Sequence, residues 1–458
     1  MTSSTGPGRR RRGGLLHDHD FRLLWIGETA SALGSHVTRL ALPLVAVVTL
    51  DATTFQVSLL TAVTWLPWLV IGLPAGAWVD RLRPRPVMLI CDGISLVVLL
   101  SVPAASWAGA LTFGHLLVAA LLVGAAAVFF QTAQQVYLPA IVAAEKQLPE
   151  ANGMLQGSDA AAYIAGPGLA GLLAQVAGAV AGLLVDALSF AVSALCLLRI
   201  RMPDRVEQPA GPSDGLRREI SDGLRFLAAD PYLRVLTGYG ALSNLALTGY
   251  QAILVVFLVR EVGASPGTVG LLLGAMSVGG LLGATFASAL SRTVGSARGM
   301  IAANAAAGPF ALLIPLTDQG PRLALVVLGG MGVGAAVVAG NVLKSSFRQA
   351  YTPRPMLGRV VVGMQFFNYG TIPLGAVIGG VLGTALGLRP TMWLMAVGVA
   401  LAPLALLVGP MKRSRDFPDH PGQDPAAGGR GGDDDEGRPE HRPAGLRRAS
   451  AQSRASLR

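Results

Sequence analysis

From Val57 to Val79 the chain carries no formal charge, and this run stops at Asp80. About 20 mostly apolar residues are enough to cross the roughly 30 Å hydrocarbon core of a bilayer as a helix. A helix satisfies its own backbone hydrogen bonds, which lipid cannot do for it. Runs of this kind recur along the whole sequence, so the chain is constrained to fold as a bundle of membrane-spanning helices.

The overall composition agrees with this constraint. Of the 458 residues, 52% are hydrophobic and 14% are charged, whereas a soluble domain has about 25% charged residues. The 58 glycines are compatible with helices, because glycine is common where membrane helices pack closely. Both cysteines, Cys91 and Cys196, lie inside apolar runs, so the sequence predicts no disulfide framework.

We expect twelve membrane-spanning segments, with a longer charged connection after the sixth. Their boundaries, good to a few residues, are 23–49, 57–79, 87–107, 113–135, 153–176, 179–199, 233–258, 268–290, 299–317, 321–343, 360–383 and 390–410. The sequence therefore predicts an all-α integral membrane protein with 12 transmembrane helices, arranged as two pseudo-symmetric six-helix bundles.

The charged connection and the two tails divide the chain further. A predicted amphipathic helix in the connection places Leu216, Ile220, Leu224 and Leu227 on one face, and a solvated linker is the alternative. The last tail has too few apolar residues to fold. The predicted divisions are a basic cytoplasmic tail at 1–20, an N-terminal bundle at 21–200, a cytoplasmic linker at 201–231, a C-terminal bundle at 232–410 and a disordered cytoplasmic tail at 411–458.

Basic residues gather on alternate connections. Arg81, Arg83 and Arg85 follow the second span, and Lys344 and Arg348 follow the tenth, whereas the opposite connections hold few basic residues. The positive-inside rule then places both termini and the linker in the cytoplasm. The abundance of Ala, Gly and Arg indicates a bacterial cell membrane as the location. The net charge of +10 is spread over loop ends and tails, which argues against nucleic-acid binding.

The two halves of the sequence echo each other. Tyr137-Leu-Pro139 follows the fourth span and Tyr351-Thr-Pro353 follows the tenth. The next span then carries an internal proline in each half, Pro167 and Pro373. Many transporters consist of two such repeats, with the binding site at the interface between them.

The stretch that ends the second span resembles the loop 2–3 motif of the major facilitator superfamily. It reads Gly76-Ala-Trp-Val-Asp80-Arg81-Leu-Arg83-Pro-Arg85. The resemblance implies a conformational latch at the cytoplasmic surface, in which Asp80 and the arginines form salt bridges that differ between two states. Asp92, early in the third span, is expected to join this charge network. Positive-inside anchoring alone would explain the arginines but not Asp80.

Other stretches are similar to the macrolide- and siderophore-exporter branch of that superfamily. They are FRLLWIGETASALGSHVTRLALPLVAV, LPEANGMLQGSD, AGPGLAG and VDALSF. Gly166, Pro167 and Gly171 resemble the antiporter motif of the fifth span, in which a proline kink and small residues permit bending and tight packing. The sequence differs from related exporters in two ways, so their proton-coupling residues cannot be assigned to this chain by analogy. The fourth-span stretch VGAAAVFFQTAQQ lacks the arginine of many drug–proton antiporters, and Glu28 and His36 stand where relatives often have glutamine and aspartate.

Polar side chains at membrane depth are the candidates for a substrate cavity or for proton coupling, because they are costly there unless they face a cavity or a partner. Glu28 is our first choice as proton carrier and Asp159 the second, with interfacial snorkelling as the alternative for Glu28. For Asp186 a structural hydrogen bond is favoured. Arg39 has two alternative roles: it binds an anionic group of the substrate, or it holds a carboxylate from another helix. The remaining candidates are His36, Gln156, Tyr163, Asn244, Gln251, Gln365 and Asn368.

Together these features favour a secondary exporter that exchanges a hydrophobic or amphipathic small molecule for protons by alternating access. The proton motive force would supply the energy, since the sequence has no phosphate-binding loop of the Gly-x4-Gly-Lys-Ser/Thr type. We expect no cofactor, no metal and no enzymatic activity, because the six histidines are scattered. An uptake symporter and a transporter-like sensor or scaffold are the alternatives. The expected partners are a small-molecule substrate and the lipid bilayer, and the carrier is expected to be monomeric.

Overall fold

The computed structural model describes residues 15–79, 82–142, 147–201, 224–408 and 415–418. Within these ranges every regular element is helical, as the predicted fold class requires. Asp80 and Arg81 of the predicted latch, most of the linker and most of both tails lie outside the described residues. Of the predicted amphipathic helix, residues 224–229 are described and helical, and Leu227 packs into the second bundle.

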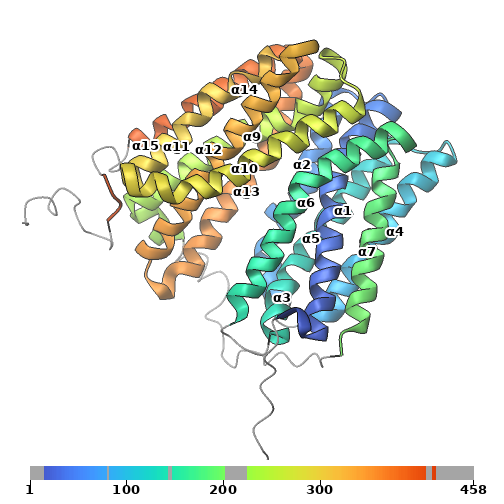
Figure 1. Ribbon diagram of the computed structural model, residues 1–458, viewed down its shortest axis with the longest axis horizontal. Helices are drawn as coiled ribbons and strands as arrows, with labels where there is room; N and C mark the ends of the chain where they lie inside the picture. The colour runs from blue at the N-terminus through green and yellow to red at the C-terminus, as the bar shows by residue number, and fades with distance from the viewer. Residues whose placement is uncertain (1–14, 80–81, 143–146, 202–223, 409–414, 419–458) are drawn as a thin grey trace, which may run out of the picture.

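The first bundle, as far as it is described, consists of six membrane-length segments (Figure 1). The 3-10 turn η1 (Leu15–His17) leads into α1 (His19–Leu44), which ends in the π-helical turn η2 (Val45–Thr49). The other segments are α2 (Thr54–Val70) with α3 (Gly72–Val79), α4 (Pro84–Trp107), α5 (Phe113–Ile141), α6 (Leu148–Ala177) and α7 (Ala181–Arg199).

The second bundle repeats this pattern. Its first segment is α9 (Pro231–Val256), which ends in the π-helical turn η4 (Phe257–Glu261). The others are α10 (Pro266–Val294), α11 (Ser296–Ala311) with the 3-10 turn η5 (Ile314–Leu316), the 3-10 turn η6 (Gly320–Arg322) with α12 (Leu323–Tyr351), α13 (Arg354–Ala385), and α14 (Leu388–Leu401) with α15 (Leu404–Leu407).

Eleven helical segments of the described chain are long and apolar enough to cross a bilayer. The remaining predicted span corresponds to α2 and α3, which are separated at Ile71. Pro74 lacks the N–H that would bond to Val70, and its ring crowds that carbonyl, so the helix is interrupted here. Together α2 and α3 cover the predicted span 57–79, and the expectation of twelve spans therefore holds with one interruption.

Local signals that begin and end the helices recur in both halves. Asp18 and Asp230 each accept hydrogen bonds from the first backbone N–H groups of α1 and α9. Gly178 and Gly387 adopt φ of 87° and 91° between the fifth and sixth segments of their bundles, a conformation that glycine takes without strain. The matching N-cap aspartates, turn glycines and π-helical turns of the two bundles support the predicted six-helix repeat.

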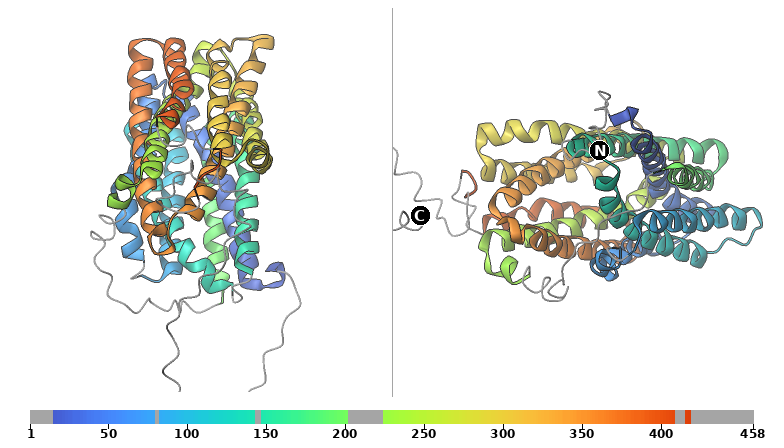
Figure 2. Two further views of the ribbon diagram at one scale, coloured as in Figure 1. Left: turned by 90° about the vertical axis from the view of Figure 1, so that its left-hand side faces the viewer. Right: turned by 90° about the horizontal axis from the view of Figure 1, so that it is seen from below.

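The two bundles form a V (Figure 1), and Figure 2 shows the same arrangement from two further sides. We call the end that carries Asp51 and Arg260 the far end, and the opposite end of each bundle, where α1 and α9 begin, the tail end. The bundles meet through two main helix pairs, α2 with α13 and α6 with α10. In Figure 1 the bundles converge at the far end and diverge toward their tail ends.

Candidate functional site

Small residues close the far end between the bundles. Gly171 of α6 lies so near α10 that a Cβ on it would fall 2.6 Å from the Gly270 Cα. On the other helix pair, a Cβ on Gly380 of α13 would fall 2.6 Å from the Ser58 Cβ of α2. Glycine permits such close backbone approach. Gly171 of the predicted antiporter motif therefore belongs to an interbundle contact, which we call the glycine seal (Gly171 and Gly270).

Polar contacts join the bundles at the same end. Arg260 Nη2 donates a hydrogen bond to Asp51 Oδ1 at 2.6 Å, within an ion pair. The backbone N–H of Gly267 donates to Gln175 Oε1 at 3.0 Å. The far end is therefore held by packing and by polar contacts together.

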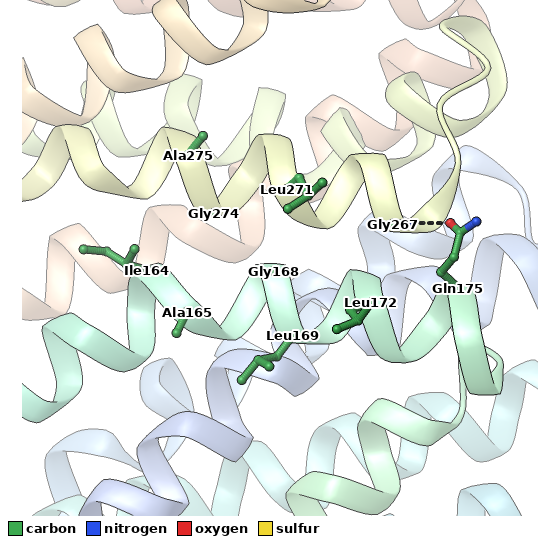
Figure 3. Close-up of a pocket in the computed structure, with 10 residues that line it drawn as sticks. All are labelled: Ile164, Ala165, Gly168, Leu169, Leu172, Gln175, Gly267, Leu271, Gly274 and Ala275. Atoms are coloured by element: carbon green, nitrogen blue, oxygen red, sulfur yellow. Dashed lines mark hydrogen bonds between the residues drawn. The ribbon is translucent and has the colours of Figure 1, made fainter.

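A groove of about 510 Å³ lies between α6 and α10 beside the seal. Figure 3 shows Ile164, Leu172 and Leu271 among its lining residues, with Gln175 reaching Gly267 at one end. Leu172 and Leu271 are 57% and 71% exposed. None of the polar candidates from the sequence lines this groove in the described chain, and apart from Gln175 its lining is apolar or glycine.

Four predicted candidates come together where α1 packs on α6. His36 Nε2 lies 2.9 Å from Asp159 Oδ1. The His36 ring also meets the Tyr163 ring edge to face, with centroids 5.4 Å apart. Arg39, further along α1, interacts electrostatically with Asp159. A histidine, a carboxylate, a phenol and a guanidinium from two distant parts of the chain thus form one cluster.

Gly166 makes this cluster possible. A Cβ at Gly166 would fall 2.9 Å from the His36 carbonyl carbon and would also strike the His36 side chain. Only glycine therefore lets α6 approach α1 at this level. Pro167 follows directly, and α6 continues beyond it to Ala177, so the predicted motif positions His36 against Asp159.

The cluster crosses from a buried to an open environment. The His36 side chain is 6% exposed, whereas that of Asp159 is 61% exposed. Tyr163 is 46% exposed, and Gln156 lies near Asp159 on the exposed side of α6. His36 sits near the middle of the segment His19–Thr49. A water-accessible carboxylate bonded to a buried imidazole can take a proton from solution and share it with that imidazole.

Glu28 and Asp92 form a second acidic site in the first bundle. Their carboxyl groups interact electrostatically between α1 and α4, and Glu28 Oε1 is buried without a hydrogen-bond partner in the described chain. Asp92 is 0% exposed, because α4 begins at Pro84, which carries Asp92 about two turns into the bundle. Arg81 of the predicted charge network lies outside the described residues, so the place of Asp92 in that network stays a prediction.

Asp186 of α7 lies inside the contact between α7 and α1. It is 1% exposed, and its Oδ1 accepts a hydrogen bond from Ser189 Oγ at 3.0 Å. Gly34 of α1 lies against both side chains and leaves no room for a Cβ. This bond lies within α7, so the helix-to-helix hydrogen bond that the sequence favours for Asp186 stays a prediction.

Arg85 makes defined contacts among the described latch residues. Its Nε donates to the Leu197 carbonyl at 2.9 Å and its Nη2 donates to the Leu198 carbonyl at 3.0 Å. A cation at the C-terminal end of α7 is favourable, because unpaired carbonyls gather there. Gly76 lies in α3, and Arg83 is the N-cap residue of α4. The switching function of the latch stays a prediction.

A polar cavity of about 240 Å³ lies in the second bundle between α9, α11, α12 and α13. We call it the second-bundle pocket. Three predicted candidates, Asn244, Gln365 and Asn368, line it, whereas Gln251 does not. Asn244 Nδ2 donates to the backbone carbonyl of Asn368 at 3.3 Å. Their role in binding stays a prediction, but the structure gathers them at one place.

The pocket adjoins the boundary between the bundles. Tyr369 lines it and also contacts α2, with ring centroids 5.7 Å from Trp65 and 5.6 Å from Trp68. Tyr369 therefore connects the wall of the pocket to the boundary between the bundles.

Four further lining residues were not predicted from the sequence, namely Tyr239, Asn304, Asn341 and Lys344. Tyr239 donates its hydroxyl to Asn304 Oδ1 at 2.5 Å, which orients that amide. The sequence assigns Lys344 to a connection, because a basic residue at the end of an apolar run reads as a loop residue. Instead, α12 continues to Tyr351 and carries Lys344 into the pocket wall. Asn304 and Asn341 lie within apolar runs of the sequence, and this position could have marked them as candidates for a polar site.

The comparison of the sequence with known families agrees with this architecture. The family described as transmembrane secretion effector matches residues 15–421. The chain belongs to this family of the major facilitator superfamily. The multidrug efflux pump Tap of Mycolicibacterium fortuitum is 30% identical over 428 residues, which cover 90% of this chain and 99% of Tap. As the sequence resemblance predicts, this member of the transmembrane secretion effector family is a multi-pass membrane transporter.

Solved transporter structures share the fold of this family member. The nucleoside transporter NupG superposes with a TM-score of 0.69 at 15% identity, over 86% of this chain and 99% of NupG. A bacterial homologue of the iron transporter ferroportin gives 0.70 at 16% identity in its inward-facing state, over 86% of this chain and 99% of the homologue. The same homologue gives 0.56 in its outward-facing state.

Proposed function

We propose that this carrier exports hydrophobic or amphipathic small molecules across a bacterial cell membrane in exchange for protons, by alternating access. The relative Tap is named a multidrug efflux pump, and a similarity that covers 90% of this chain supports drug-like substrates. In this proposal both tail ends face the cytoplasm, so the V opens inward. One chain supplies both bundles, and the carrier works as a monomer.

The contact between His36 and Asp159 carries the proposal. It brings two titratable groups together at 2.9 Å, near the middle of a span, with Asp159 open to water. A proton that neutralises Asp159 weakens its attraction to His36 and Arg39. Proton binding is thereby linked to the contact between α1 and α6, and a ligand that interacts differently with two arrangements shifts the balance between them.

Efflux measurements test this function. Wild type and Asp159→Asn are expressed in drug-hypersensitive cells, and the efflux of a panel of dyes and macrolides is followed with and without a protonophore. Wild-type efflux should stop with the protonophore, and the variant should accumulate the compounds like cells without the carrier. Asn152→Ala, an exposed neighbour on the same helix, serves as the control that keeps efflux.

Two results would overturn the proposal. Efflux that persists with the protonophore, or that Asp159→Asn leaves intact, would remove proton coupling through this contact. Accumulation by wild type that exceeds that of cells without the carrier would assign uptake instead of export.

A further inference from the structure

Lys344 places an ammonium group in the wall of the second-bundle pocket without a counter-charge. It forms no ion pair or hydrogen bond within the described chain, and Arg348 follows one turn later as a second cation. The Nε of Arg348 is likewise buried without a hydrogen-bond partner in the described chain. Charged groups at membrane depth ordinarily find a partner or mark a binding path. Arg348 Nη2 donates to Ser345 Oγ at 3.5 Å, but neither cation has a counter-charge in the described chain, and both lie on one face of α12, which requires an explanation.

The second bundle cannot supply the missing negative charge. Its described acidic side chains are few, lie toward helix ends and are already engaged. They are Asp230 with Tyr351, Glu261 with Arg389, Asp318 with Arg322 and Asp416 with Ser296. An anionic group that enters the pocket would meet a charge that the surrounding protein leaves uncompensated.

Unused amide groups surround the same space. Asn341 and Gln365 line the pocket and make no hydrogen bond to other described residues. Asn368 Oδ1 is buried without a partner in the described chain. A buried polar atom is costly until it is bonded, so the pocket offers hydrogen bonds to a ligand that carries donors and acceptors beside its charge.

We propose that the second-bundle pocket binds the acidic group of an amphipathic substrate. Lys344 pairs with a carboxylate, and the amides bond to neighbouring polar groups of the same molecule. The volume of about 240 Å³ is below the roughly 300–1,000 Å³ of sites for whole drug-sized ligands, so the pocket holds a head group while the apolar remainder lies between the bundles. The inference rests on the proposed transport of small molecules but not on its proton coupling.

Equilibrium binding of two matched dyes tests this assignment. Rhodamine B carries a free carboxylate, and its ethyl ester lacks it. Binding to purified full-length carrier in phosphatidylcholine nanodiscs is followed by fluorescence anisotropy. Lys344→Gln should weaken rhodamine B binding by roughly tenfold to a hundredfold, the range expected for one hydrogen bond to a charged group. Binding of the ester should change less than twofold, and Lys344→Arg should restore most of the loss.

Controls separate the outcomes. Arg292→Gln removes an exposed cation at the tail end of α10, outside the pocket, and should leave both dyes unaffected. Equal losses for both dyes, no loss for either, or no binding of rhodamine B by wild type would each overturn the proposal. Displacement of the dye by added phosphatidylglycerol would reassign the pocket to a lipid head group. The binding measurement needs no proton gradient. Its result is therefore independent of the efflux test, and wild-type binding of rhodamine B is expected even if the efflux of Asp159→Asn contradicts proton coupling.

Discussion

Asp159 of α6 lies 2.9 Å from His36 of α1, whereas α13 and α9, which hold the same places in the second bundle, meet through Asn368 and Asn244. The first contact joins two titratable groups, and the second joins two amides that do not titrate. The pseudo-symmetric scaffold thus presents different chemistry on its two halves. In the proposed function, proton exchange therefore belongs to the first bundle and hydrogen bonding of the solute to the second.

This division predicts that coupling and binding can be separated. Asp159→Asn should abolish gradient-driven transport in proteoliposomes but retain exchange of labelled for unlabelled substrate, because exchange requires no net proton movement. Transport assays with and without an imposed pH gradient measure both activities on one preparation. Loss of exchange together with driven transport would mean that Asp159 also holds the substrate.

The glycine seal predicts a contrast between two substitutions on one helix. Gly171→Ala must displace backbone atoms of α10, and overpacking of this kind costs about 1–3 kcal/mol. Gly168→Ala meets nothing within 4 Å and should be neutral or stabilising by up to about 1 kcal/mol. Thermal unfolding in detergent should show a lower midpoint for Gly171→Ala alone. Equal midpoints would contradict the close approach of the two backbones.

The ion pair between Asp51 and Arg260 predicts a small effect on the far end. Asp51→Asn should increase the open population only a few-fold, because an exposed pair contributes roughly 0.2–1 kcal/mol. Spin labels at Ala110 and Gln319, in a variant with both cysteines replaced by serine, report the distance between the bundles. Arg260→Gln breaks the same pair from the other side and should give a shift of the same size, whereas charge reversal is unsuitable because Asp51 has φ of 47°, which arginine rarely adopts. A shift well above tenfold in the single variant would mean that this pair dominates closure.

The hydrogen bonds of Arg85 predict that its substitution destabilises the protein more than substitution of Arg83. Arg85→Gln removes two hydrogen bonds to the end of α7 and should destabilise the first bundle by about 1–3 kcal/mol. Arg83→Gln has no corresponding bond in the described chain and should stay within about 0.5 kcal/mol of wild type. Unfolding midpoints of both variants compare the two positions. A larger loss for Arg83→Gln would favour the surface latch as the dominant role of this loop.

The proximity of Glu28 and Asp92 predicts that substitutions at the two positions have non-additive effects on the unfolding midpoint. Two carboxyl groups in one buried site repel each other when both are ionised, so Glu28→Gln or Asp92→Asn should each raise the unfolding midpoint. The double variant should add little, because either change already removes the repulsion. Measuring driven transport in the same variants decides whether Glu28 carries a proton. If Glu28→Gln uncouples transport while Asp159→Asn does not, the proton path runs through Glu28.

The number and order of spans could be predicted from the sequence, because each span must be apolar over its whole length to lie in lipid. The pairing of His36 with Asp159 could not, although both residues were candidates, because it depends on how α1 meets α6 at Gly166. Lys344 is misassigned to a connection, because hydropathy marks where an apolar run ends but not where its helix ends. The helix α12 extends past that run to Tyr351.

Gly171 and Gly270 bring two backbones together with no side chain between them. Interlocked side chains must change rotamers before they separate, and a tightly packed interior resists such changes. A joint of bare backbone has no rotamers to rearrange, so in the proposed alternating access it can part and re-form in the same register. Neither glycine lines the second-bundle pocket. Substitutions that adapt the pocket to new compounds are therefore expected to leave this joint intact, so that the substrate range can change while the closing surface stays the same.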